Sequence, residues 1–148
     1  MHMLPQLLRS VNFVRVKHIS MKTTLMLLVT NDDELENLVA DALSQTGGVS
    51  HLARDADGAL KIVCGVRDLD LIIIDFDQSH RGLTLLGAIN SCREDVPVIV
   101  ITRDDDKHIE ALAYANGATV CFRKPITVAQ LTSTICEFQQ LKTELASA

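Results

Sequence analysis

The feature that most constrains the fold of this 148-residue chain is a run of aliphatic residues that ends on a carboxylate. Residues 71–74 read Leu-Ile-Ile-Ile, and they are followed directly by Asp75 and two positions later by Asp77. A continuous apolar run of this length is typical of a strand buried on both faces, as in a parallel sheet. Open α/β sheets bind ligands at the carboxyl ends of their strands. Asp75 is therefore a candidate site residue from its position alone.

From residue 23 onward the chain alternates strand-like and helix-like segments. Apolar patterning and capping residues predict helices between and after five strands, at residues 25–29, 49–53, 69–74, 98–102 and 119–122. Strict alternation predicts a parallel sheet covered by helices on both faces, with right-handed crossovers. We therefore predict an α/β fold: a single flavodoxin-like (βα)5 doubly wound domain over residues 23–146, with a five-stranded sheet of order 2-1-3-4-5.

This strand order predicts one crevice at the carboxyl edge of the sheet. The ends of the first, third and fourth strands meet at the point where the winding direction switches. The last strand ends close by, so its final side chain can reach into the same crevice. The polar residues expected to line it are Thr30, Asn31, Asp75, Asp77, Thr102 and Lys124.

Composition excludes several classes of protein. No apolar segment approaches the roughly 20 residues needed to cross a bilayer, so we expect no membrane span. The net charge of −5 argues against direct binding of nucleic acid. The four cysteines show no paired or metal-ligand spacing, and we expect small buried hydrophobes in a reducing cytoplasm: Cys64, Cys92, Cys121 and Cys136.

Residues 1–22 differ from the rest of the chain and are predicted to lie outside the domain. The segment carries Arg9, Arg15 and Lys17, lacks acids before Met21, and has only a loose amphipathic pattern. Three interpretations stay open: an upstream start or added residues with little fixed order, a docking helix for a partner, and an organelle presequence.

Several short motifs, taken together in their order and spacing, resemble the receiver domain of bacterial two-component response regulators, the chemotaxis-type module. The resemblance covers residues 23–145. The motifs are DLIIID at 70–75, the Gly82-Leu83 pair, VPVIVIT at 96–102, NGA at 116–118 and FRKPI at 122–126.

The resemblance implies that Asp75 accepts a phosphoryl group from a histidine kinase or a phosphotransfer protein. It further implies that Lys124 and Thr102 contact phosphoryl oxygens, since phosphoryl transfer needs a nucleophile together with neutralisation of oxygen charge. A cis peptide bond before Pro125 is expected as well.

Output is expected through contact with a downstream protein, because the last helix uses the chain up to about residue 145. The resemblance points to the surface of the fourth helix, fifth strand and fifth helix, and leaves a homodimer open. Exposed positions are expected there at Lys107, Glu110, Tyr114, Gln130 and Glu137.

The chain departs from the family where receivers hold Mg²⁺. Thr30 and Asn31 stand in place of two adjacent acids. Because Mg²⁺ prefers carboxylate and water oxygens, the resemblance implies at most a weak site made by Asp75, Asp77 and Asn31. The acids that follow, Asp32 and Asp33, are predicted to cap the next helix.

Two further departures concern the neighbours of the crevice. Arg103 follows Thr102 where the family has a small residue, so it either contacts phosphate or blocks access. Cys121 replaces the family's switch aromatic, and Phe122 should face the opposite side of the sheet because side chains alternate along a strand.

Three functions remain open at this stage. The first is an atypical stand-alone response regulator receiver domain with Asp75 as phospho-acceptor, with no enzymatic activity beyond that chemistry. The second is a phosphorylation-independent pseudo-receiver that acts as a protein-interaction module. The third, a small-molecule binder of the same fold, is disfavoured because no phosphate-cradling loop follows the first strand.

Overall fold

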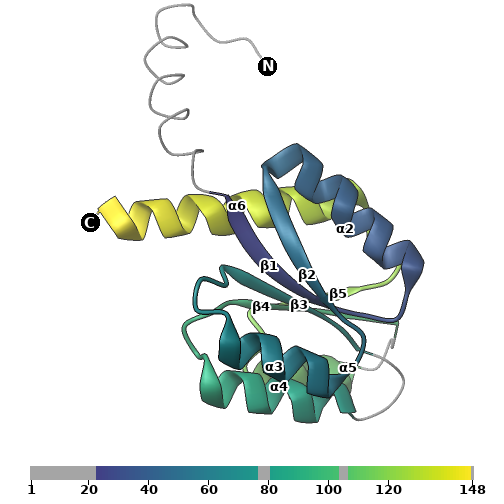
Figure 1. Ribbon diagram of the computed structural model, residues 1–148. Coiled ribbons are helices and arrows are strands. Elements are labelled where there is room, and N and C mark those ends of the chain that lie inside the picture. The colour runs from purple at the N-terminus through teal and green to yellow at the C-terminus, as the bar shows by residue number, and fades with distance from the viewer. Residues whose placement is uncertain (1–22, 77–80, 104–106, 148) are drawn as a thin grey trace, which may run out of the picture.

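The computed structural model describes residues 23–76, 81–103 and 107–147, and its elements alternate as the sequence predicts (Figure 1). The strands and helices are β1 Thr24–Val29, α2 Asp33–Thr46, β2 Gly48–Ala53, α3 Ala56–Gly65, β3 Leu71–Phe76, α4 Arg81–Cys92, β4 Val98–Thr102, α5 Lys107–Ala115, β5 Val120–Arg123 and α6 Val128–Ser147. All strand pairs are parallel and the order is β2-β1-β3-β4-β5, which confirms the predicted flavodoxin-like fold. The predicted leader and Asp77 lie outside the described residues.

Helices cover both faces of the sheet. Helices α2 and α6 lie on one face, while α3, α4 and α5 lie on the other (Figure 1). The central strand β3 sends Ile72 and Ile74 into the core beneath α3 and α4, and Leu71 and Ile73 into the core beneath α2 and α6. All four side chains are at most 1% exposed. The apolar run is therefore buried on both faces, as its sequence indicates.

The register of the central strands brings the polar residues of the crevice to one edge. Val29 of β1 pairs with Ile74 of β3, so Thr30 and Asp75 follow side by side. Farther along the same edge, Phe76 pairs with Thr102 of β4. The main chain then places Lys124 next to Thr102, because the Lys124 N–H donates to the Thr102 carbonyl at 2.7 Å.

Helix α2 begins at the same edge, with Asp32 as its N-cap. The Asp32 Oδ1 atom accepts hydrogen bonds from the backbone N–H groups of Glu34 and Leu35, at 2.9 and 3.4 Å. This confirms the predicted cap. Asp33 is instead the first helical residue, where an acid is favoured by the helix dipole. The helix ends at Gly47, whose φ of 80° is a left-handed conformation that glycine adopts without steric cost.

The prediction that the cysteines are buried is wrong for three of them. Cys64, Cys92 and Cys136 are exposed, and only Cys121 is partly buried. Their apolar neighbours in the sequence belong to amphipathic helices, whose inward stripe does not include these positions. Within the three described segments, no helix combines the length and apolar character that a membrane span requires.

Candidate functional site

Asp75 lies at the carboxyl end of β3 with both carboxylate oxygens engaged. The Lys124 Nζ atom is 2.9 Å from Asp75 Oδ1, and the Thr30 hydroxyl donates a hydrogen bond to Asp75 Oδ2 at 2.6 Å. The Asp75 side chain is 10% exposed and that of Lys124 is 15% exposed. The pair is therefore mostly shielded from water, where an ionic contact is stronger than at the surface.

Thr30 links Asp75 to the start of helix α2. Its hydroxyl also accepts a hydrogen bond from the Asp32 backbone N–H at 2.9 Å. Because Thr30 is buried and its Oγ1 has a donor in the Asp32 N–H, the hydroxyl proton is directed toward Asp75. Thr30, which the resemblance aligns with a metal-binding acid, is thus a hydrogen-bond donor to Asp75.

Lys124 is shared between two carboxylates. Its Nζ atom lies 3.1 Å from Asp32 Oδ2 as well as 2.9 Å from Asp75 Oδ1. Arg103 adds a second cation, with its Nη2 atom 3.6 Å from the same Asp32 oxygen. The hydrogen bond from the Lys124 ammonium holds the pKa of Asp32 below its ordinary value of 3.8, and the two capping N–H groups act in the same direction.

Sequence reasoning missed the position of Asp32 in this network. It was predicted only as a cap, yet its second oxygen faces Lys124 and Arg103. The sequence does contain one signal for this position. Asp32 comes two residues after Thr30, at the sheet edge that Lys124 also reaches directly after β5. The Arg103 guanidinium pairs with Asp32 at the site, and whether it contacts phosphate or blocks access stays a prediction.

Thr102 and the turn after Lys124 complete the edge. Thr102 ends β4 and is 6% exposed, so the structure brings it to the same edge as Asp75 and Lys124. The Lys124–Pro125 peptide bond is cis, as expected. Asn31 is exposed at the start of the turn into α2. Asp77, the remaining predicted ligand, lies outside the described residues.

The described residues do not fit a Mg²⁺ site. Mg²⁺ needs oxygen ligands that are open to it, with carboxylates to offset its charge. Here both oxygens of Asp75 and both oxygens of Asp32 already accept contacts from protein donors. In residues 23–76, 81–103 and 107–147, no cluster of three His, Cys, Asp or Glu side chains could hold a metal ion.

The surface expected to carry output is exposed. Lys107, Glu110 and Tyr114 on α5, and Gln130 and Glu137 on α6, are all accessible to solvent. Phe122 packs in the core beneath α2 and α6, whereas Cys121 packs in the opposite one, which confirms the predicted alternation.

The tyrosine of α5 covers part of the β5 edge. The Tyr114 hydroxyl accepts a hydrogen bond from the Cys121 backbone N–H at 3.1 Å. Strand β5 lies at one end of the sheet, and unpaired N–H groups on such a strand invite association with other chains. Tyr114 therefore satisfies a donor that the sheet itself leaves unpaired.

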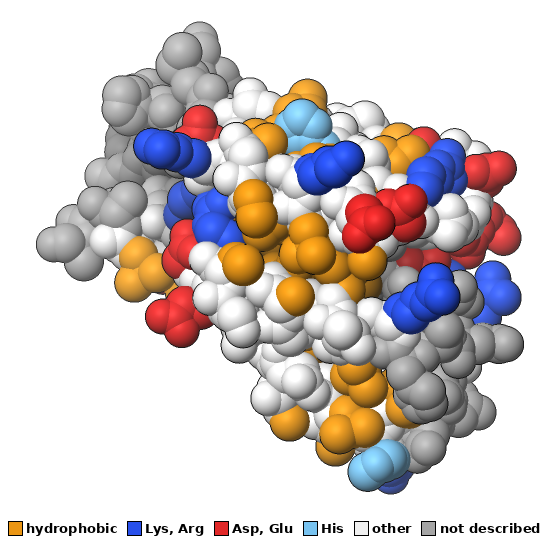
Figure 2. Space-filling model, turned by 60° about the horizontal axis from the view of Figure 1, so that its bottom comes forward, with side chains coloured by type: hydrophobic (Ala, Val, Ile, Leu, Met, Phe, Trp, Pro, Cys, Tyr) orange, Lys and Arg blue, Asp and Glu red, His pale blue; other side chains and the backbone are white. Residues whose placement is uncertain are grey.

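On the face that carries α3, α4 and α5, the described residues form no large area of one charge. Figure 2 shows Lys and Arg side chains interspersed with Asp and Glu around a central group of hydrophobic side chains. A mixed surface of this kind does not provide the basic patch typical of nucleic-acid binding.

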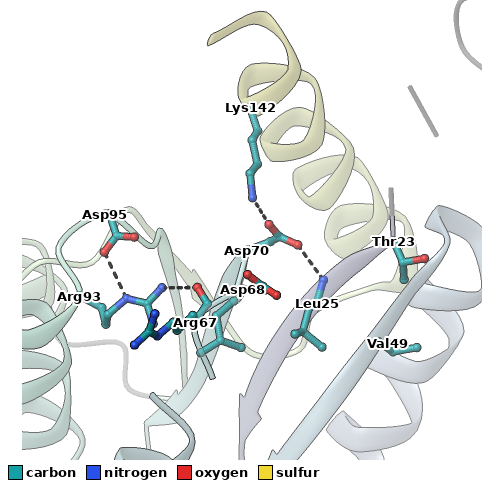
Figure 3. Close-up of a pocket in the computed structure, with 10 residues that line it drawn as sticks. Thr23, Leu25, Val49, Arg67, Asp68, Asp70, Arg93, Asp95 and Lys142 are labelled. Atoms are coloured by element: carbon teal, nitrogen blue, oxygen red, sulfur yellow. Dashed lines mark hydrogen bonds and ion pairs between the residues drawn. The ribbon is translucent and has the colours of Figure 1, made fainter. Parts of the chain in front are cut away.

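A cavity of about 580 Å³ opens at the opposite, amino-terminal edge of the sheet (Figure 3). Several of its charged side chains contact other groups of the protein. Arg93 donates to the carbonyl oxygens of Val66 and Arg67, both at 3.0 Å. Asp70 pairs with Lys142 and accepts from the Leu25 N–H at 2.9 Å. These contacts hold β1, β3 and α6 together, which indicates a structural role.

Comparison with protein families gives an independent result. Residues 26–136 match the family model described as the response regulator receiver domain. The chain is also 33% identical over 109 residues to the nitrogen assimilation regulatory protein NtrX of Azorhizobium caulinodans. That match covers 72% of this chain and 24% of the relative, so the chain spans about a quarter of the length of the curated relative it matches.

Solved structures show the same fold. A response regulator from Thermotoga maritima superposes with a TM-score of 0.74 at 20% identity, covering 80% of this chain and 99% of that one. A signal receiver domain of an HD domain-containing protein from Pseudomonas fluorescens Pf-5 gives a TM-score of 0.73 at 25% identity, covering 83% and 99%. The chemotaxis response regulator CheY4 of Vibrio cholerae gives 0.70 at 22% identity, covering 79% and 99%.

Proposed function

The chain belongs to the response regulator receiver family, and from this premise we propose that it is an atypical receiver of a two-component phosphorelay with Asp75 as phospho-acceptor. The observation that carries the proposal is the contact between Lys124 Nζ and Asp75 Oδ1 at 2.9 Å, at the carboxyl edge of the sheet. A nucleophilic carboxylate beside a fixed ammonium is the minimum arrangement for accepting a phosphoryl group.

In the proposed step, a carboxylate oxygen of Asp75 attacks the phosphorus of a phosphohistidine on a kinase or phosphotransfer protein. The phosphorus–nitrogen bond breaks, the imidazole leaves with the bonding electron pair, and an acyl phosphate forms on Asp75. The Lys124 ammonium offsets negative charge on the phosphoryl oxygens. The Thr102 hydroxyl, buried at the same edge, is the second proposed donor to them.

Receiver domains generally bind Mg²⁺ at their acidic site, where the ion neutralises phosphoryl charge. The residues described here do not fit that ion, because Thr30 replaces an acid and hydrogen-bonds to Asp75 at 2.6 Å. We therefore propose a transfer that is slow compared with that of receivers that keep both acids, and that depends little on Mg²⁺.

A second candidate function is a pseudo-receiver that signals by protein contact without phosphorylation. The observation that favours it is the same short Thr30–Asp75 hydrogen bond, which occupies one of the two oxygens that could attack phosphorus. In both cases the proposed partners are two-component proteins in the cytoplasm. The proposed contact surface is the exposed face of α5, β5 and α6.

Intact-mass spectrometry after incubation with phosphoramidate separates the two candidates. The wild-type chain should gain one phosphoryl mass, with and without Mg²⁺, and Asp75→Asn should gain none. Asp33→Asn is the matched control, because it removes the same charge from an exposed acid and should behave as wild type. If wild type stays unmodified while a receiver that keeps both acids is labelled, Asp75 phosphorylation is refuted and the pseudo-receiver remains.

A further inference from the structure

The cations of the site converge on one oxygen of Asp32. Lys124 Nζ lies 3.1 Å and Arg103 Nη2 lies 3.6 Å from Asp32 Oδ2. Its other oxygen accepts hydrogen bonds from the N–H groups of Glu34 and Leu35. A single carboxylate thus rests among two side-chain cations and the first turn of α2, which is the set of donors that a phosphate-class oxyanion prefers.

The formal charges of this cluster cancel. Two carboxylates, Asp32 and Asp75, face two cations, Lys124 and Arg103. A free oxyanion that approaches Lys124 therefore meets a cation already shared between two acids. Removing the charge of Asp32 alone would leave one net positive charge around the same donors, of which Lys124 is 15% exposed and Arg103 is 66% exposed.

We propose that Asp32 is an internal competitor that occupies a metal-independent oxyanion site formed by Lys124 and Arg103. The ligand class is a phosphate-like dianion, whether free or carried on Asp75. Such a group has to displace the Asp32 carboxylate from the two cations before it can contact both. Arg103, which has no counterpart in the family pattern, supplies the second positive charge of this site. The proposal shares Lys124 with the proposed function but needs no transfer to Asp75.

Asp32→Asn tests this idea with little disturbance to folding. Asparagine is as good an N-cap as aspartate, so the capping bonds to Glu34 and Leu35 can persist. Asp32→Ser, another neutral N-cap, gives a second variant if the first folds poorly. Asp33→Asn is the control for net charge, because Asp33 is adjacent but its side chain is 87% exposed and pairs with Arg54 instead.

The experiment is a titration of these proteins with inorganic orthophosphate, monitored by amide NMR. A chelator is present throughout to remove divalent cations. Asp32→Asn should bind orthophosphate at least about tenfold more tightly than wild type, from the removal of one nearby negative charge. The shifts should centre on Lys124, Arg103 and the first turn of α2. Asp33→Asn should match wild type, and Asp32→Asn combined with Arg103→Gln should lose the gain.

The outcomes are distinct from those of the mass-spectrometric test. Equal phosphate affinity in Asp32→Asn and Asp33→Asn would overturn the proposal, as would a gain that survives Arg103→Gln. Because orthophosphate binds without a covalent bond to Asp75, the oxyanion site can be found in a protein that never becomes phosphorylated. Equally, a phosphorylated wild type does not rescue the proposal if Asp32→Asn binds no better.

Discussion

Thr30→Val is the most direct perturbation of the Asp75 network, because valine keeps the shape of threonine and replaces the hydroxyl with a methyl group. That hydroxyl donates to Asp75 Oδ2 at 2.6 Å and accepts from the Asp32 N–H at 2.9 Å, and Thr30 is 3% exposed. A hydrogen bond to a charged group contributes about 1.5–3 kcal/mol, and a neutral one about 0.5–1.5 kcal/mol. Burial of the new methyl group stabilises the folded state by about 0.8 kcal/mol, which offsets part of this loss.

We therefore expect Thr30→Val to lower the free energy of unfolding by about 2 kcal/mol. Urea denaturation followed by circular dichroism measures this, provided that the slope of free energy against urea stays unchanged. The matched control is Thr132→Val, because the Thr132 hydroxyl is buried and makes no hydrogen bond within the described residues. That variant should be neutral or slightly more stable than wild type. If the two substitutions change stability by the same amount, the Thr30–Asp75 bond does not stabilise the fold as argued.

Three further changes test other contacts. The pKa of Asp32 in the folded protein lies below its ordinary value of 3.8, so the stability that its charge contributes is present above pH 3.8 and is lost as the pH falls through the folded-state pKa. In urea titrations from pH 7 to pH 3, the difference in unfolding free energy between wild type and Asp32→Asn should therefore shrink. A difference that stays constant would contradict this. Arg93→Met removes three hydrogen bonds to carbonyls at the end of α3 and should cost about 2 kcal/mol in the same assay. Tyr114→Phe should speed hydrogen exchange at the Cys121 amide while lowering global stability by less than about 1 kcal/mol, and unchanged exchange would show that the hydroxyl does not protect it.

The fold was predictable because its strongest signals are local. The apolar run in β3, the acids before α2 and the glycine after it each agree with the element they sit in. Alternation of strands and helices then restricts the topology to very few arrangements. The boundaries differ by one or two residues, as for β3, which begins at Leu71 rather than at residue 69. Leu69 is buried in the core although it lies before the strand, so its apolar character alone does not mark where strand pairing begins.

The site was predictable only in part. Position at the ends of strands was sufficient to bring Thr30, Asp75, Thr102 and Lys124 together. What the sequence could not give is the side-chain geometry. An N-cap has two carboxylate oxygens, and the capping pattern says nothing about where the second one points. The direction of Asp32 Oδ2 depends on Lys124, which is 92 residues away in the chain.

The departures from the family pattern compensate one another electrostatically. With acids at both 30 and 31, the crevice would hold four carboxylates with Asp32 and Asp75, a repulsive cluster that a bound cation relieves. The present chain removes two of those charges and adds Arg103, so the described cluster is neutral with protein groups alone. Because the substitutions act on the same charge balance, their effects should not be additive. An acid at position 30 alone would add a third carboxylate to the cluster, while Lys124 stays paired with Asp32 and Asp75. The metal site is therefore not one substitution away, because the cluster that a bound cation relieves needs acids at both 30 and 31.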